Sequence, residues 1–270
     1  MKKDLVIAVA GSEGFVGAAL VARLRAAGHT VIPLPAVSGN LPGSDVLIHL
    51  GRESDVQETR RLISRLGDAV SLPKVLLHGS STDLYGHRPG EALDETSAPG
   101  RGLRAEACRA TEAEARGAER LGIRTVLLRF GAVLDPSGGL LGTMLPLLRR
   151  GLCFVLGDPA DRFSWISLDD ALRMIEFAMT TESVRGALNV TAPVAATQGA
   201  FARAAASLAG RRVLGRLRSR LLRRTLGVFT DLQDVAPAKS LQEGFGHQHP
   251  TLQFWMSALE DARHPFRENA

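Results

Sequence analysis

The fold of this chain is decided close to its start, by the stretch Asp4-Leu-Val-Ile-Ala-Val-Ala-Gly-Ser-Glu-Gly-Phe-Val-Gly17. The apolar run predicts a buried parallel strand, and the apolar residues behind the glycines recur at helical spacing. Gly11, Gly14 and Gly17 form the turn between them. Glycine allows the positive φ of a tight turn, and the free N–H groups of a first helical turn can bind a diphosphate. We interpret this turn as a dinucleotide site; the alternative is a turn that serves packing alone.

Apolar runs and helical patterns alternate beyond this point. Strands are expected near 30–34, 46–50, 74–78 and 125–130, and helices near 56–66, 105–121 and 138–150. This alternation predicts an α/β fold, a Rossmann-like doubly wound parallel sheet with right-handed crossovers. We divide the chain into a dinucleotide-binding core, 1–152, and a smaller C-terminal substrate lobe, 153–270, of which 163–192 partly returns to the core.

The composition favours a globular enzyme, with 45% hydrophobic and 23% charged residues. Two lysines, an apolar run and Ala8-Val-Ala10 resemble a secretory signal, but the run is too short and Glu13 follows at once. No segment approaches the ~18–20 apolar residues of a membrane span. Cys108 and Cys153 stand far apart, and no histidine lies near them at ligand spacing, so neither a disulfide framework nor a metal site is predicted. We expect a soluble, cytoplasmic protein.

The adenosine side of the expected dinucleotide site is reduced. Residues 35–45 are too few for the further helix and strand that a dinucleotide fold places there. No Asp or Glu stands between Gly14 and Ser44, so the acid that would hold the ribose hydroxyls is missing. Arg52 is the nearest basic candidate, with a solvated loop arginine as the alternative. The cofactor is therefore expected to be NAD or NADP, without a preference.

Several motifs together resemble a known family. They are the glycine turn, Ser80-Ser-Thr-Asp-Leu-Tyr-Gly86, Arg162-Phe-Ser-Trp-Ile-Ser-Leu-Asp-Asp170 and Gly186-Ala-Leu-Asn-Val-Thr-Ala-Pro193. With them the chain resembles the extended short-chain dehydrogenase/reductase superfamily, NAD(P)-dependent epimerase/dehydratase type. Within it, the chain is most similar to a small epimerase-like subfamily. The resemblance implies a Rossmann-like core, a C-terminal lobe over the nicotinamide end and a small-molecule substrate.

The carry-over of catalytic residues from that family is uneven. Ser81 falls on its catalytic Ser/Thr, and Arg129 matches a strand end that borders the nicotinamide. The Tyr-x-x-x-Lys pair of the superfamily is replaced by Arg104 and Cys108. The closest subfamily also tends to lack this pair. Tyr85, the single tyrosine, is the remaining catalytic candidate, although its usual role in the superfamily is structural.

The sequence therefore predicts two sets of site residues. The catalytic candidates are Ser81 and Tyr85. The cofactor-binding candidates are Gly11, Ser12, Glu13, Gly14, Phe15, Val16, Gly17, Leu50, Gly51, Arg52, Ser80 and Arg129. His78, Asp83 and Glu106 are further acid–base candidates, with packing or plain surface roles as the alternatives.

The second half contains two further patterns. Phe163–Asp170 predicts a strand that leads into a helix capped by Asp169 or Asp170. Residues 211–224 combine arginines with leucines at helical spacing and predict a basic amphipathic helix. That helix could bind nucleic acid, an anionic membrane or a substrate phosphate; we favour a lobe helix with solvated arginines. Few aromatics interleave with the arginines, which argues against nucleic acid.

Two functions of different classes remain open. One is an NAD(P)-dependent oxidoreductase or epimerase-like enzyme with a substituted acid–base set. The other is a Rossmann scaffold without hydride transfer, which would serve cofactor-independent chemistry or ligand sensing. The family resemblance favours the enzyme. It also implies dimerisation through two helices per subunit, but the helices expected near 56–66 and 105–121 show no decisive apolar face, so a homodimer stays open.

Overall fold

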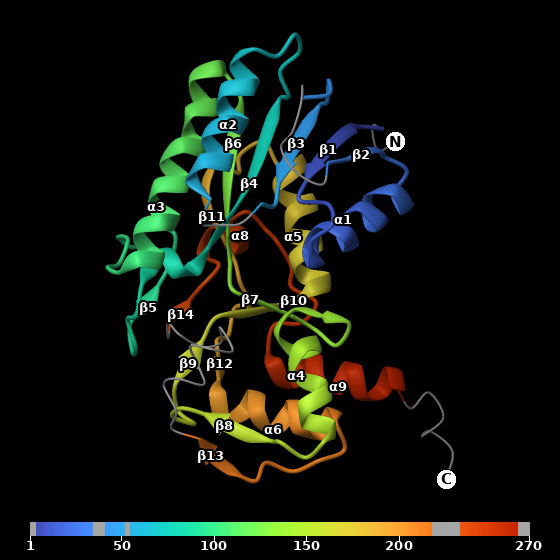
Figure 1. The fold of residues 1–270 in the computed structure, drawn as a ribbon, viewed down its shortest axis with the longest axis vertical. Helices are drawn as coiled ribbons and strands as arrows, with labels where there is room; N and C mark the ends of the chain where they lie inside the picture. Colours follow the sequence, from blue (N-terminus) through green and yellow to red (C-terminus); the bar gives the residue numbers. More distant parts are fainter. Residues whose placement is uncertain (1–3, 35–40, 52–54, 218–232, 264–270) are drawn as a thin grey trace.

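The computed structural model describes residues 4–34, 41–51, 55–217 and 233–263 (Figure 1). A six-stranded parallel sheet lies in the upper half, with the order β11-β6-β4-β3-β1-β2. Its strands are β1 (Val6–Ala10), β2 (Thr30–Leu34), β3 (Val46–His49), β4 (Val75–Ser81), β6 (Arg124–Phe130) and β11 (Gly186–Val190). The predicted Rossmann-like α/β fold is confirmed.

Helices cover both faces of the sheet, which explains why its central strands are apolar at successive positions. Side chains at successive positions point to opposite faces, so a strand buried on both sides is apolar throughout. Ile7 and Val9 pack in one cluster with α1 (Phe15–Ala26) and α5 (Leu168–Thr180). Ala8 and Ala10 pack in another with α2 (Val56–Gly67), beside which α3 (Leu103–Ala115) lies.

The strand order places the expected site. The chain passes from β1 to β2 on one side and then returns to β3 on the other side of β1. Ligands of open α/β sheets bind at the carboxyl ends of the strands where the order reverses in this way. In the described residues 41–45 there is no helix or strand before β3, and β2 is the edge strand. The crevice between the carboxyl ends of β1 and β3 is therefore the expected ligand site.

A second apolar cluster lies below the sheet in Figure 1. It joins α4 (Gly139–Arg149), α6 (Gln198–Leu208) and α9 (Leu252–Arg263), and the rings of Trp165 and Trp255 lie 5.7 Å apart within it. Two short parallel strands, β7 (Ala132–Asp135) and β10 (Trp165–Ser167), pair just beneath the sheet. α4 belongs to this second cluster although it precedes residue 153.

Two sequence predictions are wrong in detail. Gly215–Leu217 form strand β13, paired in parallel with β8 (Phe154–Leu156), and not a helix; residues 218–224 of the predicted basic helix lie outside the described residues. The open edge of β8 offers backbone partners, and Arg216 binds Gly157 O and Asp158. α5 is capped by Ser167, whose hydroxyl accepts from Asp170 N, so Asp169 and Asp170 occupy the first turn instead.

The other helices differ only at their ends. The helix predicted over 105–121 is α3 continued by the 3-10 helix η2 (Arg116–Leu121), and β4 runs into the 3-10 helix η1 (Thr82–Tyr85). Every helix in the part of the chain described here is too short or too polar to cross a bilayer.

Candidate functional site

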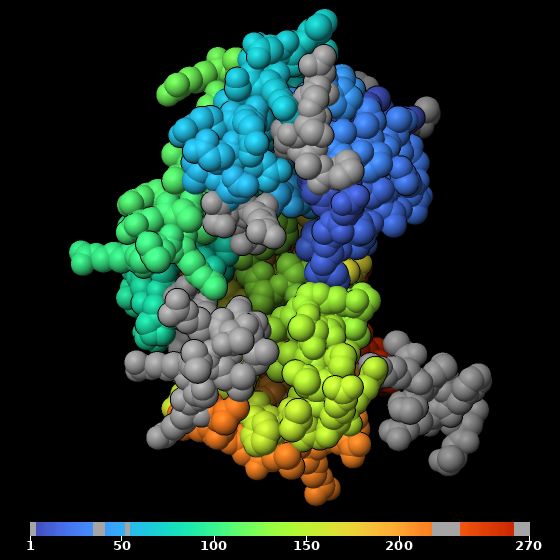
Figure 2. Space-filling view, viewed as in Figure 1, coloured from blue at the N-terminus to red at the C-terminus, as the bar shows by residue number. Residues whose placement is uncertain are grey.

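A cavity of about 410 Å³ opens where β1 and β3 end. Figure 2 shows this hollow at the middle of the molecule, between the blue surface of α1 and the light green surface of α4. Its lining is almost wholly backbone and apolar side chains, contributed by Gly11, Gly14, Phe15, Val16, Gly17, Leu50, Gly51, Gly79, Phe130, Gly131, Ala132, Val133, Gly139 and Leu140. Seven of these residues were predicted as cofactor contacts from the sequence.

The three glycines of the turn differ in how well the fold would tolerate a side chain at their positions. Gly11 has φ +80°, and a Cβ there would lie 2.4 Å from Leu50 O. A Cβ on Gly17 would lie 2.1 Å from Gly11 O, so the helix could not approach the turn. A Cβ on Gly14 would meet only Gly11 O, at 3.3 Å, and Gly14 has an ordinary extended conformation. Gly11 and Gly17 are therefore required by packing, whereas the fold itself tolerates a side chain at Gly14.

The first turn of α1 contains no negatively charged side chain that would offset the partial positive charge of the helix N-terminus. Gly14 is the N-cap and supplies no side-chain acceptor, and no acidic residue stands in the first turn. Backbone N–H groups at such a terminus have no intrahelical partner and carry a partial positive charge. Because Phe15, Val16 and Gly17 line the cavity, this terminus suits an anionic group placed there.

The β3 end supplies the second wall. Leu50 N donates to Ala10 O, and Gly51 follows it along the cavity. A Cβ on Gly51 would lie 2.7 Å from Nε2 of His49 and 2.8 Å from Oε2 of Glu58. The backbone therefore runs directly over this histidine. Arg52, the predicted basic contact, lies outside the described residues.

His49 is paired with a second buried histidine. Its Nδ1 lies 3.0 Å from Nδ1 of His78, and their rings stack with centroids 5.0 Å apart. Burial lowers the pKa of both imidazoles, that of His78 to about 3. A neutral pair can share one Nδ1–H···Nδ1 hydrogen bond. These features agree with the packing alternative for His78 and not with acid–base work.

The lower wall begins at the end of β6, the strand end that the family resemblance assigns to the nicotinamide, and continues into residues that the sequence did not assign to the cofactor. Gly131 N donates to Val190 O and Ala132 N to Ser164 O, which turns the chain from β6 into β7 beneath the cavity. The ring of Phe15 lies against the turn at Gly138 and Gly139, where a Cβ would come within 2.5 and 2.8 Å of ring atoms. The Gly138-Gly139 pair was visible in the sequence as a turn, but its partner in space was not.

Ser81 lies on the cavity side of the sheet. It stands two residues after Gly79 on β4, so the pleat points both to the same face. It is 8% exposed, and its Oγ accepts a hydrogen bond from Asp83 N. The hydroxyl proton is thereby left to donate to a neighbouring oxygen. Ser81 is thus the predicted catalytic residue that the geometry favours.

Tyr85, Arg129 and Ser80 lie together in a buried network on the opposite face of the sheet. Arg129 donates from Nε and Nη2 to the two carboxylate oxygens of Glu112, and Ser80 Oγ donates to the same carboxylate. Tyr85 Oη accepts from Arg129 Nη1 and donates to Asn189 Oδ1. None of the three lines the cavity, and neither does Ser81; the buried hydrogen bonds of Ser80, Tyr85 and Arg129 favour structural roles, while their predicted cofactor and catalytic roles stay predictions. The pleat distinguishes Ser80 from Ser81, and this signal could have been read from the sequence.

The remaining candidates lie at the edges of the site. Ser12 and Glu13 belong to the glycine turn without lining the cavity, and they stay predictions. Arg104, at the position of the superfamily tyrosine, is half exposed and pairs with Asp83 at 3.2 Å. Cys108, at the lysine position, is buried within α3. Glu106 is exposed in the first turn of α3.

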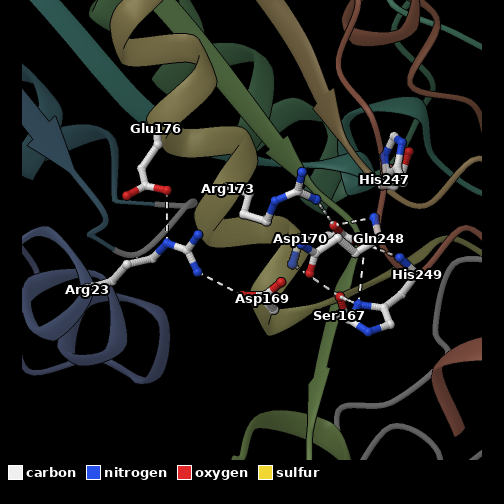
Figure 3. A network of polar contacts seen from close by, with 10 residues as sticks. Arg23, Ser167, Asp169, Asp170, Arg173, Glu176, His247, Gln248 and His249 are labelled. Carbon is white, nitrogen blue, oxygen red and sulfur yellow. Dashed lines mark hydrogen bonds and ion pairs between the residues drawn. The ribbon is translucent and has the colours of Figure 1, made fainter. Parts of the chain in front are cut away.

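A second polar cluster lies outside the cavity (Figure 3). Asp170, Asp169 and His249 approach one another closely enough to suggest a metal site. The oxygens of Asp170 are, however, already used: they accept from Gln248 N, His249 N and Arg173 Nη1 at 2.7–2.9 Å. Asp169 pairs with Arg23 of α1. The cluster holds the returning C-terminal segment against α5 and α1.

Comparison with known proteins places the chain among epimerase-like relatives. No family model matches it. It is 32% identical to an epimerase family protein of Mycobacterium bovis, over 92% of this chain and 95% of that protein. The human epimerase family protein SDR39U1 (isoform 2), solved with NADPH, superimposes with a TM-score of 0.83 at 25% identity, covering 95% of this chain and 99% of that one. A nucleoside-diphosphate sugar epimerase from Corynebacterium glutamicum gives 0.76 at 26% identity, covering 95% and 57%.

Proposed function

The chain belongs to the epimerase family proteins, within the extended short-chain dehydrogenase/reductase superfamily, and from that premise we propose that it is an NAD(P)-dependent oxidoreductase or epimerase-like enzyme. Its substrate is a small molecule that enters below the sheet, between the core and the second apolar cluster. We also propose a division of the chain into a dinucleotide-binding core, 1–152, and a substrate lobe, 153–270. Residues 163–192 return to the core through β10 and β11.

One observation carries the proposal: the uncapped N-terminus of α1 borders the cavity at Gly14. A pyrophosphate at this place would accept from the N–H groups of the first helical turn, which contains no acidic side chain. The cavity then extends along Gly51 on one side and along Phe130 and Gly131 on the other. This arrangement suits a dinucleotide whose pyrophosphate sits at the turn.

The residues near β2 set no barrier against a phosphorylated ribose. No acid stands between Gly14 and Ser44, so neither NAD nor NADP would meet a like charge there. The human relative was solved with NADPH. We propose NAD or NADP as the cofactor on this basis.

Ser81 is the residue proposed to act on the substrate. When bound, the nicotinamide would supply or accept hydride. Ser81 would donate its hydroxyl proton in a hydrogen bond to the substrate oxygen, held in place by the Asp83 N–H that its Oγ accepts. Tyr85 and Arg129 would support the sheet without touching the substrate.

One observation favours the scaffold without hydride transfer as a second candidate. Arg104 and Cys108 occupy the positions of the superfamily's tyrosine and lysine, and the only tyrosine is buried in a network. Such a protein would transfer no hydride and would use the cavity for cofactor-independent chemistry or for ligand sensing. The comparisons with epimerase-like relatives favour the enzyme.

Thermal unfolding with NAD⁺, NADH, NADP⁺ and NADPH tests the cofactor proposal, because a ligand that binds only the native state raises the unfolding midpoint. Replacing Gly14 is the sharp control. Gly14→Asp supplies a good N-cap and should fold as well as the wild type, but its carboxylate would occupy and repel the anion site. Gly14→Ser supplies a cap without the charge.

We expect a midpoint increase with at least one nucleotide in the wild type, a smaller one in Gly14→Ser and none in Gly14→Asp. Equal increases in wild type and Gly14→Asp would contradict binding at this turn. Binding followed by no absorbance change with any small carbonyl or alcohol substrate would favour the scaffold. A homodimer through α2 and α3 also remains a proposal, which light scattering tests.

A further inference from the structure

The end of the molecule farthest from the sheet carries exposed leucines. Leu147, Leu152 and Leu214 are 38%, 53% and 67% exposed. Single exposed leucines are common on protein surfaces, whereas several together mark a contact surface. Backbone hydrogen bonds bring them close together: Leu152 N donates to Leu147 O, and Leu214 N donates to the carbonyl of Cys153, the residue after Leu152. They therefore form one patch at the lower end of Figure 1, near β8 and β13.

Four exposed arginines stand among these leucines. Arg149 and Arg150 end α4, and Arg211 and Arg212 follow α6. Arg211 Nε donates to Arg149 O at 3.2 Å, which brings the two pairs together. We call these leucines and arginines the distal patch.

The positive charge of the distal patch is not neutralised within the described chain. None of its four arginines forms an ion pair with a described residue. Asp158 pairs with Arg216 instead, and Glu260 accepts a hydrogen bond from the hydroxyl of Ser207. An anionic partner could therefore approach the patch without displacing an acidic side chain.

The combination of arginines and exposed leucines indicates which class of anionic partner fits the distal patch. A bilayer with acidic phospholipids offers phosphates to arginine and, directly beneath them, acyl chains to leucine. A nucleic acid offers phosphates and stacking bases, and the distal patch has no aromatic ring. The leucines would stay in water on a nucleic acid and would leave it on a bilayer.

We propose that the distal patch docks this protein on the surface of an anionic phospholipid bilayer. The arginines bind headgroup phosphates, and the leucines enter the interfacial region. The proposed contact is peripheral: the arginines and leucines of the distal patch reach the headgroups and the interfacial region and no deeper. α4 spans from the patch to the cavity, since its first residues, Gly139 and Leu140, line the latter. At 1.5 Å per residue, its 11 residues separate the two by about 16 Å, so the cavity stays open above the membrane.

Vesicle co-sedimentation tests the proposal. The probes are vesicles of phosphatidylcholine alone and of phosphatidylcholine mixed with phosphatidylglycerol, with transfer RNA as a soluble polyanion. We expect binding to the mixed vesicles only. Arg150→Gln combined with Arg212→Gln should weaken it by about 30-fold, at roughly fivefold for each arginine near an anionic surface. Leu152→Ser combined with Leu214→Ser should weaken it by about 10-fold.

A matched control lies on the opposite side of the cavity. Arg109→Gln combined with Leu72→Ser removes one exposed arginine and one exposed leucine from α3 and the loop before β4. This variant should bind as the wild type does. All variants should keep the wild-type unfolding midpoint, because the replaced side chains are exposed.

Leu152→Trp gives a direct readout of insertion. Trp165 and Trp255 are buried and should not respond, so a blue shift of emission with mixed vesicles reports residue 152 alone. No binding to mixed vesicles, binding unaffected by the patch variants, or loss with the arginine variant alone would each overturn the proposal. Tighter binding to transfer RNA, lost in the same variants, would also overturn it and assign the patch to nucleic acid.

Discussion

The hydroxyl oxygen of Tyr85 lies 2.8 Å from Nη1 of Arg129. The same hydroxyl donates to Oδ1 of Asn189, so both of its principal hydrogen-bonding capacities are used inside the protein. Tyr85 is fully buried, and burial raises the pKa of its phenol despite the neighbouring guanidinium. It therefore stays protonated at neutral pH and holds β6 and β11 to the segment that follows β4.

Tyr85→Phe should destabilise the protein without affecting the cofactor. The change leaves Arg129 and Asn189 each short of one buried partner, which costs about 1–3 kcal/mol of unfolding free energy. Chemical denaturation measures this loss. The midpoint increase with nucleotide should match that of the wild type. A variant of normal stability with altered cofactor-dependent turnover would show instead that the phenol takes part in the reaction.

Glu112→Gln should be among the most damaging single changes in the core. It removes the charge from a carboxylate that binds Arg129 with both oxygens, and it leaves a buried guanidinium unpaired. Breaking one side of a buried pair costs about 3–5 kcal/mol. Glu114→Gln is the matched control, because its partner Arg60 is exposed and its loss should leave denaturation almost unchanged. Similar losses in both variants would contradict the special weight of the buried pair.

Stability should fall as the pH drops below the ordinary pKa of histidine. Burial lowers the pKa of His78 from 6.5 to about 3, and it lowers that of His49 as well. Between these values the unfolded chain binds protons that the folded protein cannot accept. The free energy of unfolding is thus highest above pH 6.5 and falls toward pH 3, by about 1.4 kcal/mol per pH unit for His78 alone.

Denaturation midpoints measured across this pH range check that slope. His78→Gln keeps a hydrogen-bonding group beside His49 and removes one titrating ring, so its profile should be flatter. An unchanged slope in the variant would place the acid sensitivity in other residues.

Gly17→Ala should destabilise the protein although it adds a good helix former. The new methyl group would lie 2.1 Å from Gly11 O, and relief of that overlap moves the turn or the helix at a cost of about 1–3 kcal/mol. Gly67→Ala is the control, because nothing lies within 4 Å of its added Cβ at the end of α2. That control should be neutral or slightly stabilising. Equal behaviour of the two alanines would show that the turn adapts freely.

The sequence could predict the sheet because its evidence is local. The apolar run at Val6–Ala10, the glycine turn and the helix after it lie within one short stretch, and the pattern of each strand shows in its own residues. The hydroxyl cap of α5 was equally available, since Ser167 stands three residues before Asp170 in a capping pattern.

The missed features depend on distant segments. β13 exists because β8, some sixty residues earlier in the chain, presents an open edge to it. The contact of Phe15 with the Gly138-Gly139 turn likewise joins two ends of the core. Neither is encoded in a periodicity. The strand pleat puts Ser81 on the same face as Gly79, which lines the cavity, whereas the hydrogen bonds of Tyr85 and Arg129 to Asn189 and Glu112 depend on distant segments that no local motif shows.

The polar cluster around Asp170 makes residues 245–249 part of the folded core and not a dispensable tail. The carboxylate of Asp170 accepts from the main chain at Gln248 and His249, while Asp169 beside it holds Arg23 of the helix that starts at the glycine turn. Fragments that stop before residue 245 would remove the main-chain donors Gln248 N and His249 N from the buried carboxylate of Asp170, which Arg173 would still pair. Residues 245–249 are therefore needed for the native contacts of α5, and affinity tags are better attached after α9.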